Sequence, residues 1–182
     1  MKRIVIDAGH GGEDPGAVNG KLKEKEIALK ISLYCKGYLQ KNYKVNIKMT
    51  RNNDVFVSLK ERSKIANRFK ADLFISVHVN AGGGTGFESF IYENSERCTL
   101  DHQKCIHKEI VSTMDAHTEI KDRGMKTANY AVLRETKMPA ILTENLFIDV
   151  DDILLKDEEL LKSIGEAHAR GIAKSLGLEE KV

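Results

Sequence analysis

The sequence predicts a single α/β domain with a largely parallel, twisted sheet that is covered by helices on both faces. Short apolar segments of strand length alternate with segments whose apolar residues recur at helical spacing, and this alternation is typical of parallel sheets. The chain has 182 residues, of which 41% are hydrophobic and 31% are charged. This length and composition support one well-buried core in an ordinary globular protein.

Apolar patterns near the amino terminus define the first three elements. Three consecutive apolar residues between charged ones predict a short buried strand over 3–7. Apolar residues recur three or four positions apart over 24–40, which predicts a helix. Residues 45–49 alternate between apolar and polar side chains, as expected for a strand with one buried face.

A capping pattern marks the next helix, and two strands follow it. Ser58 and Glu61 stand three positions apart ahead of an apolar run, and this spacing lets each side chain cap the backbone N–H of the other. A helix is therefore expected to begin at Ser58 and to end near Phe69. Strands are expected over 73–77 and 86–92, on either side of a glycine-rich loop.

The remaining elements lie in the carboxyl-terminal half. Apolar residues at helical spacing predict a helix over 96–116, and a short apolar segment at 131–133 is expected to be extended. Pro139 fixes the entry to a strand over 140–143, and Asp157 begins the last helix. Strands separated by helices in this way favour parallel pairing.

Charge, hydropathy and cysteine spacing exclude several classes of protein. The 29 basic and 27 acidic residues leave a net charge of +2, and no basic cluster is interleaved with aromatics, so nucleic acid is not an expected partner. No apolar run approaches the roughly 18 residues of a membrane span, so no membrane insertion is expected. Cys35, Cys98 and Cys105 form no CxxC pair and are expected to be free thiols. A monomer is the default expectation.

Two histidines that follow predicted strands, His10 and His78, are the most informative residues of the chain. The carboxyl ends of parallel strands meet at one edge of a sheet, where ligands and catalytic groups gather. Two histidines with a carboxylate suit zinc, whose catalytic sites have three protein ligands and an open position. Glu24, Glu26 and Glu144 are all candidates for the third ligand. Capping or surface roles for the histidines, and helix-dipole roles for the first two glutamates, are the alternatives.

Several short segments, in order along the chain, carry a resemblance to a known family. They are Asp7-Ala8-Gly9-His10-Gly11-Gly12, Pro15-Gly16-Ala17, Glu24-Lys25-Glu26-Ile27-Ala28-Leu29, Thr50-Arg51, Arg62 with Ala66-Asn67, Ser76-Val77-His78-Val79-Asn80-Ala81, and Leu142-Thr143-Glu144. Together they resemble the zinc-dependent N-acetylmuramoyl-L-alanine amidases of the Amidase_3 type. The resemblance implies that one Zn²⁺ per chain is held by His10, Glu24 and His78, and that Glu144 is the catalytic acid/base. It thereby selects Glu24 over Glu26.

The resemblance also implies an activity and a substrate. Such an enzyme hydrolyses the amide bond between the lactyl group of N-acetylmuramic acid and L-alanine in peptidoglycan, and so causes cell-wall lysis or remodelling, as endolysins and autolysins do. Glu144 would take a proton from the attacking water and return it to the departing nitrogen. Residues 1–178 would form the catalytic domain, and 179–182 a tail or the start of a linker.

Three further residues are expected near the substrate or the metal. Asn80 follows a ligand, and Arg123 lies in an Asp-Arg-Gly segment that resembles one of the family, so both are candidates for substrate binding, with structural hydrogen bonding as the alternative. Glu88 is a candidate for orienting a metal-binding histidine through contact with its ring, without binding the metal itself, and a solvent-facing carboxylate is the alternative. The histidines that lack motif context are not expected to have a catalytic role: His102, His107, His117 and His168.

Alternatives remain for the groove and for the activity. After Glu144 the chain reads Asn145-Leu146-Phe147-Ile148-Asp149, where many relatives have a small residue, an aromatic and an SN pair, so the substrate groove is expected to differ there. A zinc carboxypeptidase or endopeptidase acting on wall peptides would use the same ligands and base. A catalytically silent wall-binding module would not need Glu144.

The expected location follows from the substrate. An enzyme of peptidoglycan acts at the bacterial cell wall. The apolar stretch after Lys2 and Arg3 is interrupted by Asp7, so no cleaved signal is expected. Release by phage or mother-cell lysis, or origin as an excised domain, is therefore expected.

Overall fold

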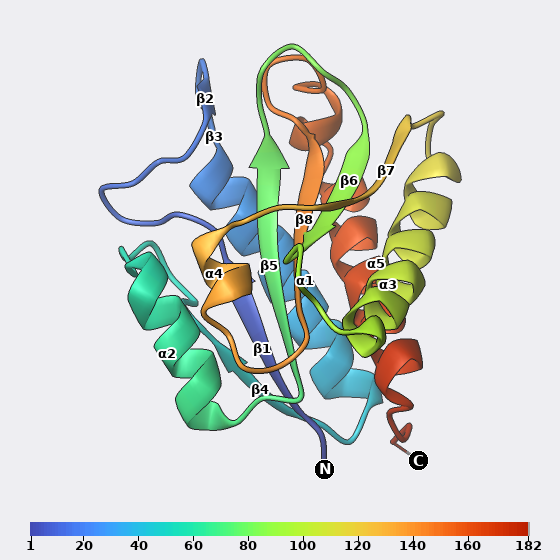
Figure 1. Ribbon diagram of the computed structural model, residues 1–182. Helices are drawn as coiled ribbons and strands as arrows, with labels where there is room; N and C mark the ends of the chain where they lie inside the picture. The colour runs from blue at the N-terminus through green and yellow to red at the C-terminus, as the bar shows by residue number, and fades with distance from the viewer. Residues whose placement is uncertain (182) are drawn as a thin grey trace.

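A computed structural model describes residues 1–181, in which six strands form one sheet in the order β4-β1-β5-β8-β6-β7 (Figure 1). The strands are β1 (Arg3–Ala8), β4 (Asn46–Met49), β5 (Leu73–Asn80), β6 (Phe87–Ile91), β7 (Asp122–Thr127) and β8 (Ala140–Phe147). Within this sheet, as described for residues 1–181, β6–β8 is the only antiparallel pair. A two-residue hairpin, β2 (Val18–Asn19) and β3 (Leu22–Lys23), stands apart from the sheet. The predicted, largely parallel sheet is confirmed.

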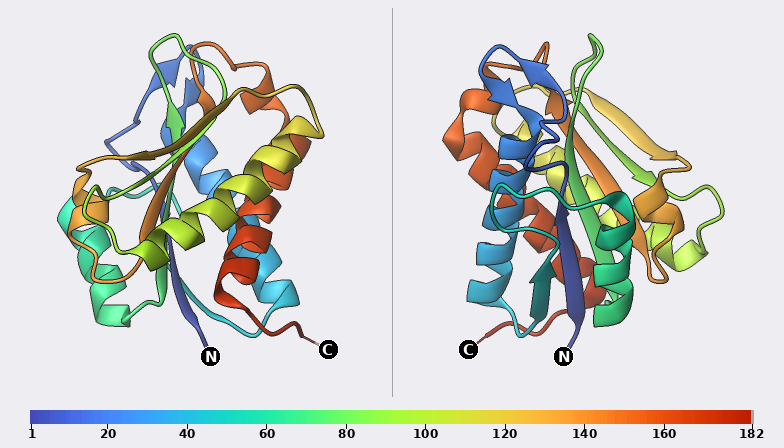
Figure 2. Two further views of the ribbon diagram at one scale, coloured as in Figure 1. Left: turned by 45° about the vertical axis from the view of Figure 1, so that its right-hand side comes forward. Right: turned by 90° about the vertical axis from the view of Figure 1, so that its left-hand side faces the viewer.

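Helices cover both faces of this sheet, as predicted (Figure 2). One face carries α1 (Glu24–Asn42), α3 (Arg97–Asp115) and α5 (Glu158–Leu176), and the other carries α2 (Leu59–Phe69) and the single-turn α4 (Ala131–Arg134); η1 (Leu154–Lys156) precedes α5. Strand residues alternate between the two apolar layers. Ile4 and Ile6 of β1 join the larger core under α1 and α5, whereas Val5 packs with Ala66 of α2.

Side-chain caps begin two of the helices at the predicted residues. The Ser58 hydroxyl accepts a hydrogen bond from the Glu61 N–H (3.3 Å), and Asp157 accepts from two N–H groups of the first turn of α5. The reciprocal half of the predicted capping pair is wrong, because the Glu61 carboxylate instead accepts from Arg68 (3.2 Å). One cap of this kind stabilises a helix by about 1 kcal/mol.

The segment at 131–133 was expected to be extended, and this is wrong, because it forms α4. Tyr130 is the N-cap, and Val132 and Leu133 bury their side chains in the smaller apolar layer. Three apolar residues are too few to distinguish a helical from an extended period.

Two strands differ from the sequence expectation. The edge strand β7 was not predicted, because most of its side chains are polar and exposed and so lack an apolar alternation. β8 continues past Thr143 to Phe147, with an irregularity in its pairing and a left-handed φ of 69° at Leu146. Glu144 therefore lies within β8 and not at its end.

The cysteines and the chain end complete the description. All three cysteines are free, and Cys35 is buried on the inner face of α1, as expected. No helix among residues 1–181 combines the length and the apolar character needed to span a bilayer. Residues 179–181 run beside the end of α1, where Lys44 N–H donates to Glu179 O (2.9 Å) and Lys181 N–H donates to Asn42 O (2.8 Å).

Candidate active site

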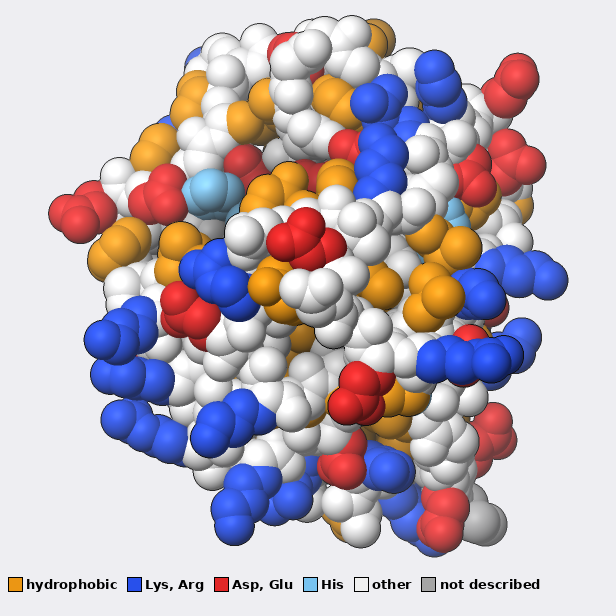
Figure 3. Space-filling view, in the orientation of Figure 1, with side chains coloured by type: hydrophobic (Ala, Val, Ile, Leu, Met, Phe, Trp, Pro, Cys, Tyr) orange, Lys and Arg blue, Asp and Glu red, His pale blue; other side chains and the backbone are white. Residues whose placement is uncertain are grey.

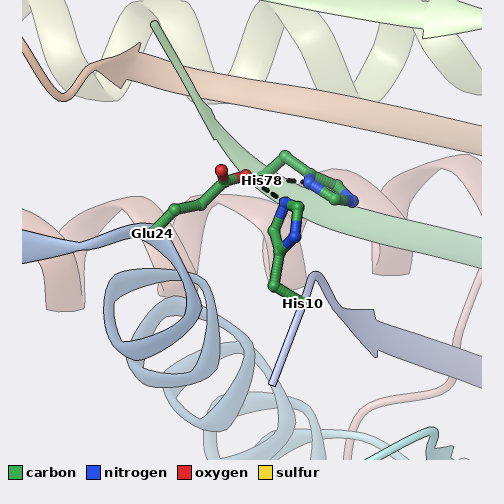
Figure 4. A group of neighbouring side chains, drawn as sticks. All are labelled: His10, Glu24 and His78. Carbon is green, nitrogen blue, oxygen red and sulfur yellow. Dashed lines mark hydrogen bonds and ion pairs between the residues drawn. The ribbon is translucent and has the colours of Figure 1, made fainter. Parts of the chain in front are cut away.

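His10, Glu24 and His78 meet at the carboxyl edge of β1 and β5, against the first turn of α1 (Figure 4). One ligand atom from each lies within 4.8 Å of the others. The Glu24 Oε1 is 2.9 Å from His78 Nδ1 and 3.1 Å from His10 Nε2. The topology therefore assembles the three residues that the resemblance selects, although they are far apart in the sequence.

Glycines permit this close approach. A Cβ atom at Gly9 would stand 2.4 Å from the His78 ring, and one at Gly16 would stand 2.6 Å from the Glu24 carboxylate. Contacts this short cannot be accommodated without moving the side chains of His78 and Glu24. His10 itself has a left-handed φ of 58°, an uncommon conformation for a non-glycine residue that the surrounding contacts must maintain.

Two buried arginines hold the loop that carries His10. Arg51 donates to the carbonyls of Ala8 (2.9 Å) and Gly9 (2.6 Å), and Arg62 donates to those of Ala8 (2.6 Å) and His10 (2.6 Å). A sharp turn at the end of β1 would otherwise leave these acceptors unpaired, at a cost of about 1–3 kcal/mol each. Both arginines belong to the segments that resemble the family.

Glu24 is held as an ionised carboxylate. It is only 5% exposed; its Oε2 accepts from Ala17 N–H (2.9 Å) and its Oε1 from Val79 N–H (3.1 Å). Burial opposes ionisation, but hydrogen bonds from His10 and His78 outweigh it and hold the pKa of Glu24 well below its usual range. The cluster therefore offers one anionic oxygen and two imidazoles.

Asp14 completes the environment of His10 and was not singled out from the sequence. Its Oδ2 is 2.8 Å from His10 Nδ1, and its Oδ1 accepts from Gly16 N–H (3.0 Å). A histidine that donates one ring N–H to a carboxylate presents the other nitrogen as a lone pair, which is the arrangement common around metal ligands. The one feature of the sequence that could have pointed to Asp14 is its position, four residues after His10.

The donor set fits zinc. Zn²⁺ takes nitrogen and carboxylate oxygen at about 2.0–2.2 Å, so adjacent ligand atoms of a tetrahedral site are about 3.3 Å apart. The carboxylate-to-imidazole separations of 2.9 and 3.1 Å are close to this spacing. His10, Glu24 and His78 could therefore hold the ion.

Glu144 lies beside this cluster through the register of the sheet. It pairs with His78 of β5 on one side and with Glu88 of β6 on the other. Its Oε2 is buried and has no hydrogen-bond partner among residues 1–181. Burial, with contributions from the carboxylates of Glu24 and Glu88, raises the pKa of Glu144 to about 7. A carboxyl group that exchanges a proton near neutrality suits an acid/base.

A cavity of about 360 Å³ opens in front of these groups. Its polar residues are His10, Glu24, His78, Asn80 and Glu144, and its apolar wall includes Leu59, Val79, Tyr130, Ala131, Val132 and Leu142. Hydrophobic side chains gather around a hollow in the upper half of the face drawn in Figure 3, with basic side chains to its right. A larger hollow of about 750 Å³ lies by both termini, away from these groups.

The three residues expected near the substrate form their own cluster. Glu88 is 4% exposed and accepts from Asn80 Nδ2 (2.6 Å) and Arg123 Nε (3.0 Å), with Lys126 as a third contact. Among residues 1–181, Glu88 has no hydrogen bond or ion pair with a histidine, and it is buried, so neither interpretation offered for it, histidine orientation or a solvent-facing position, is correct. Asn80 lines the cavity, whereas Arg123 is not among its lining residues. Lys126 was not singled out from the sequence.

The remaining histidines lie outside the cavity. His168 is buried in α5, where its Nε2 is 3.0 Å from the Thr143 hydroxyl, and burial lowers its pKa to about 4. His107 of α3 contacts the Ser89 hydroxyl (2.8 Å) and the Asp122 carboxylate (2.9 Å). Both are packed inside the fold, which agrees with the expectation that they take no part in catalysis.

Comparisons with known proteins show which proteins this chain resembles. The family model for Amidase_3, described as N-acetylmuramoyl-L-alanine amidase, matches residues 4–174. The sporulation-specific N-acetylmuramoyl-L-alanine amidase of Bacillus subtilis (strain 168) is 44% identical over 183 residues, which cover 99% of this chain and 70% of that protein. The endolysin of Bacillus phage SPP1 is 48% identical over 185 residues, which cover 99% of this chain and 68% of that protein.

Solved structures show the same fold. The catalytic domain of CwlV, an N-acetylmuramoyl-L-alanine amidase from Bacillus (Paenibacillus) polymyxa var. colistinus, has a TM-score of 0.91 at 33% identity. That similarity covers 98% of this chain and 100% of the other. Sequence, fold and the matched family model therefore agree, and this chain belongs to the Amidase_3 family of N-acetylmuramoyl-L-alanine amidases.

Proposed function

We propose that this protein is a zinc-dependent amidase that cuts the bond between the lactyl group of N-acetylmuramic acid and L-alanine in peptidoglycan. The observation that carries the proposal is the cluster of His10, Glu24 and His78 in an open cavity beside Glu144. The three residues are assigned as ligands of one Zn²⁺ per chain, and residues 1–178 as the catalytic domain. The names of the relatives support the bond specificity.

The chain's own residues account for the proton transfers. Bound Zn²⁺ would supply Lewis-acid activation of water and stabilisation of negative charge. Glu144 takes a proton from the attacking water as the oxygen–carbon bond forms at the lactyl carbonyl. It then gives the proton to the nitrogen of L-alanine as the carbon–nitrogen bond breaks. The products are a lactyl carboxylate and a peptide with a free amino terminus.

The cell wall is the proposed place of action. The relatives include a phage endolysin and probable cell wall amidases named LytH from Staphylococcus aureus. Their names support a role in wall lysis or remodelling for this chain. The protein is proposed to act on peptidoglycan as a monomer.

Digestion of purified peptidoglycan tests the proposal. The zinc-loaded protein is expected to release new amino-terminal alanine without new reducing sugar ends, and a chelator is expected to stop the release until zinc is restored. New amino or carboxyl termini within the stem peptide would show a peptidase, and new reducing ends would show a glycosidase. Intact peptidoglycan after digestion would favour a binding module.

Asp14→Ala is expected to weaken zinc binding about 10-fold to 100-fold, because loss of the carboxylate frees the His10 ring to rotate and lowers its basicity. Competition with a chromogenic chelator measures the dissociation constant. Glu13→Ala is the matched control, since this neighbouring carboxylate is exposed and should leave zinc affinity unchanged. Equal affinity in the Asp14→Ala variant and the wild type would contradict this role for Asp14.

Glu144→Gln is expected to stabilise the metal-free protein at pH 8 but not at pH 4. The folded-state pKa of about 7 lies above the ordinary 4.5, so between these values the folded protein binds more protons and its stability falls as pH rises. Above pH 7 the buried carboxylate costs a few kcal/mol, since each pKa unit corresponds to about 1.4 kcal/mol.

Thermal unfolding of chelator-treated protein measures this difference. The increase in Tm over wild type should be several degrees at pH 8 and close to zero at pH 4, where Glu144 is mostly protonated in both the folded and the unfolded state. Glu13→Gln provides a control at an exposed position. An increase of the same size at both pH values would show that the ionised carboxylate is not the cause.

A further inference from the structure

Two cations of the edge strand β7 converge on one carboxylate beside the cavity. Arg123 Nε donates to Glu88 Oε2 (3.0 Å), and Lys126 Nζ contacts the same oxygen. Burial opposes ionisation of Glu88, but the hydrogen bonds from Lys126 and Arg123 outweigh it and lower its pKa. The single negative charge of Glu88 thus faces the two positive charges of Arg123 and Lys126. The three side chains together keep a net positive charge at the edge of the cleft.

The guanidinium of Arg123 is placed so that it can bind a further anion. Its Cζ lies 4.7 Å from the centroid of the Phe147 ring, which supports one face of the plane. Among residues 1–181 its Nε makes a hydrogen bond, whereas neither Nη atom does. The side chain is 27% exposed and that of Lys126 is 40% exposed, so solvent and ligands can reach both. A guanidinium edge with free N–H groups matches a carboxylate in geometry.

Hydrogen bonds to α3 and β6 fix the strand that carries these cations. Asp122, the residue before Arg123, is 2.9 Å from His107 Nε2, and its Oδ1 also accepts from Gly124 N–H (2.7 Å). His107 Nδ1 in turn lies 2.8 Å from the Ser89 hydroxyl of β6. The turn at Arg123 is therefore anchored to the buried His107 ring through Asp122, which lowers the entropy that a ligand would have to remove.

The spacing of the strands relates this group to the reacting bond. Glu144 of β8 pairs with Glu88 of β6, and β7 is the next strand, so β7 is two strand spacings, about 10 Å, from Glu144. In an extended peptide, the α-carboxylate of the residue after L-alanine lies about 7 Å from the attacked lactyl carbonyl. A hydrogen bond of about 3 Å between that carboxylate and a side chain of β7 accounts for the rest of the distance from Glu144 to β7.

We propose that Arg123 and Lys126 form a subsite for the free α-carboxylate of the residue that follows L-alanine in the stem peptide. The subsite rests on the proposed function, because it places the scissile amide at Glu144. The protein thereby selects stem peptides with an acidic second residue over peptides in which that carboxylate is converted to an amide. Glu88 acts as the positioning residue that holds both cations toward the cleft.

Paired synthetic substrates test the subsite. They are N-acetylmuramoyl-L-alanyl-γ-D-glutamyl-L-lysine and the same compound with the D-glutamyl α-carboxylate amidated. The wild type is expected to cleave the acidic substrate with a kcat/KM about 10-fold to 100-fold higher, mainly through KM, as expected for a charge-assisted contact. Arg123→Gln should remove most of this preference by weakening the acidic substrate alone. Lys126→Gln should act in the same direction.

Controls separate substrate recognition from structural effects. Lys108→Gln removes an exposed positive charge on α3 and should leave the preference unchanged. Arg123→Lys keeps the positive charge but loses the planar guanidinium, so it should retain part of the preference for the acidic substrate. The comparison of the two substrates on the wild type needs no variant, so it stands even where a variant fails to fold.

Two results would overturn the subsite. The wild type could cleave both substrates equally well, or Arg123→Gln could lower kcat/KM by the same factor on both, which would make the cluster structural. Failure of the zinc-loaded wild type to cleave either substrate at the lactyl amide is a different result. It would refute the proposed function, and the subsite with it.

Discussion

Glu144→Gln is expected to lower kcat by about 10³-fold to 10⁴-fold while leaving zinc content unchanged. Glutamine keeps the size of the side chain but cannot accept the proton of the attacking water or deliver one to the departing nitrogen. A single group that serves both transfers should fall in the upper part of the range for general acid–base catalysis. Turnover of a muramyl peptide and zinc per chain are measured on the same preparation.

Glu26→Gln is a matched control for this experiment. Glu26 lies in the first turn of α1, as Glu24 does, but its side chain is 55% exposed and pairs with Lys23 at 3.7 Å. Its loss should change neither turnover nor zinc content. The role assigned to Glu144 would have to be abandoned if Glu144→Gln retained near-normal turnover, or if it lost zinc in proportion to its activity.

The fold was predictable wherever a segment was long and periodic. The helices α1 and α5 each repeat apolar residues over five turns, so their period is unambiguous, and caps such as Ser58 mark the helix starts. The short elements were not predictable in the same way. Tertiary packing makes 131–133 a helical turn, and β7 is recognisable as a strand only through its pairing with β6.

The candidate site was partly predictable for a topological reason. Parallel strands bring their carboxyl ends to one edge, so His10 and His78 were expected to be neighbours. Periodicity could not choose between Glu24 and Glu26, and the family resemblance was needed for that step. In the structure Glu24 is 5% exposed and faces both histidines, whereas Glu26 turns outward.

The contacts around the site could not be read from the sequence because they join distant segments. Lys126 of β7 reaches Glu88 of the neighbouring strand β6, and Tyr130 lines the cavity only because α4 folds over the sheet. Phe147, in the segment after Glu144 where the chain departs from many relatives, lies under the Arg123 guanidinium. Sequence patterns predict the helices and strands and the edge of the sheet where a residue lies. Which side chains contact one another depends on how the helices and strands pack.

His10→Ala and His78→Ala are each expected to abolish zinc binding and activity together. Each substitution removes one of two neutral nitrogen ligands and leaves a pair that cannot hold a catalytic zinc, for which three protein ligands are usual. Zinc affinity is measured by chelator competition and activity by release of amino-terminal alanine. His117→Ala is the control, because His117 is exposed just after α3 and should affect neither quantity.

Glu24→Gln distinguishes a ligand from a base at the same edge of the sheet. It removes the only anionic ligand from a site that otherwise offers two imidazoles, so zinc affinity should fall along with activity, and saturating zinc should restore part of the activity. Glu144→Gln should show no such rescue, because its zinc site is intact. If added zinc rescued both variants equally, or if His10→Ala kept full zinc occupancy and turnover, the assignment of ligands would be wrong.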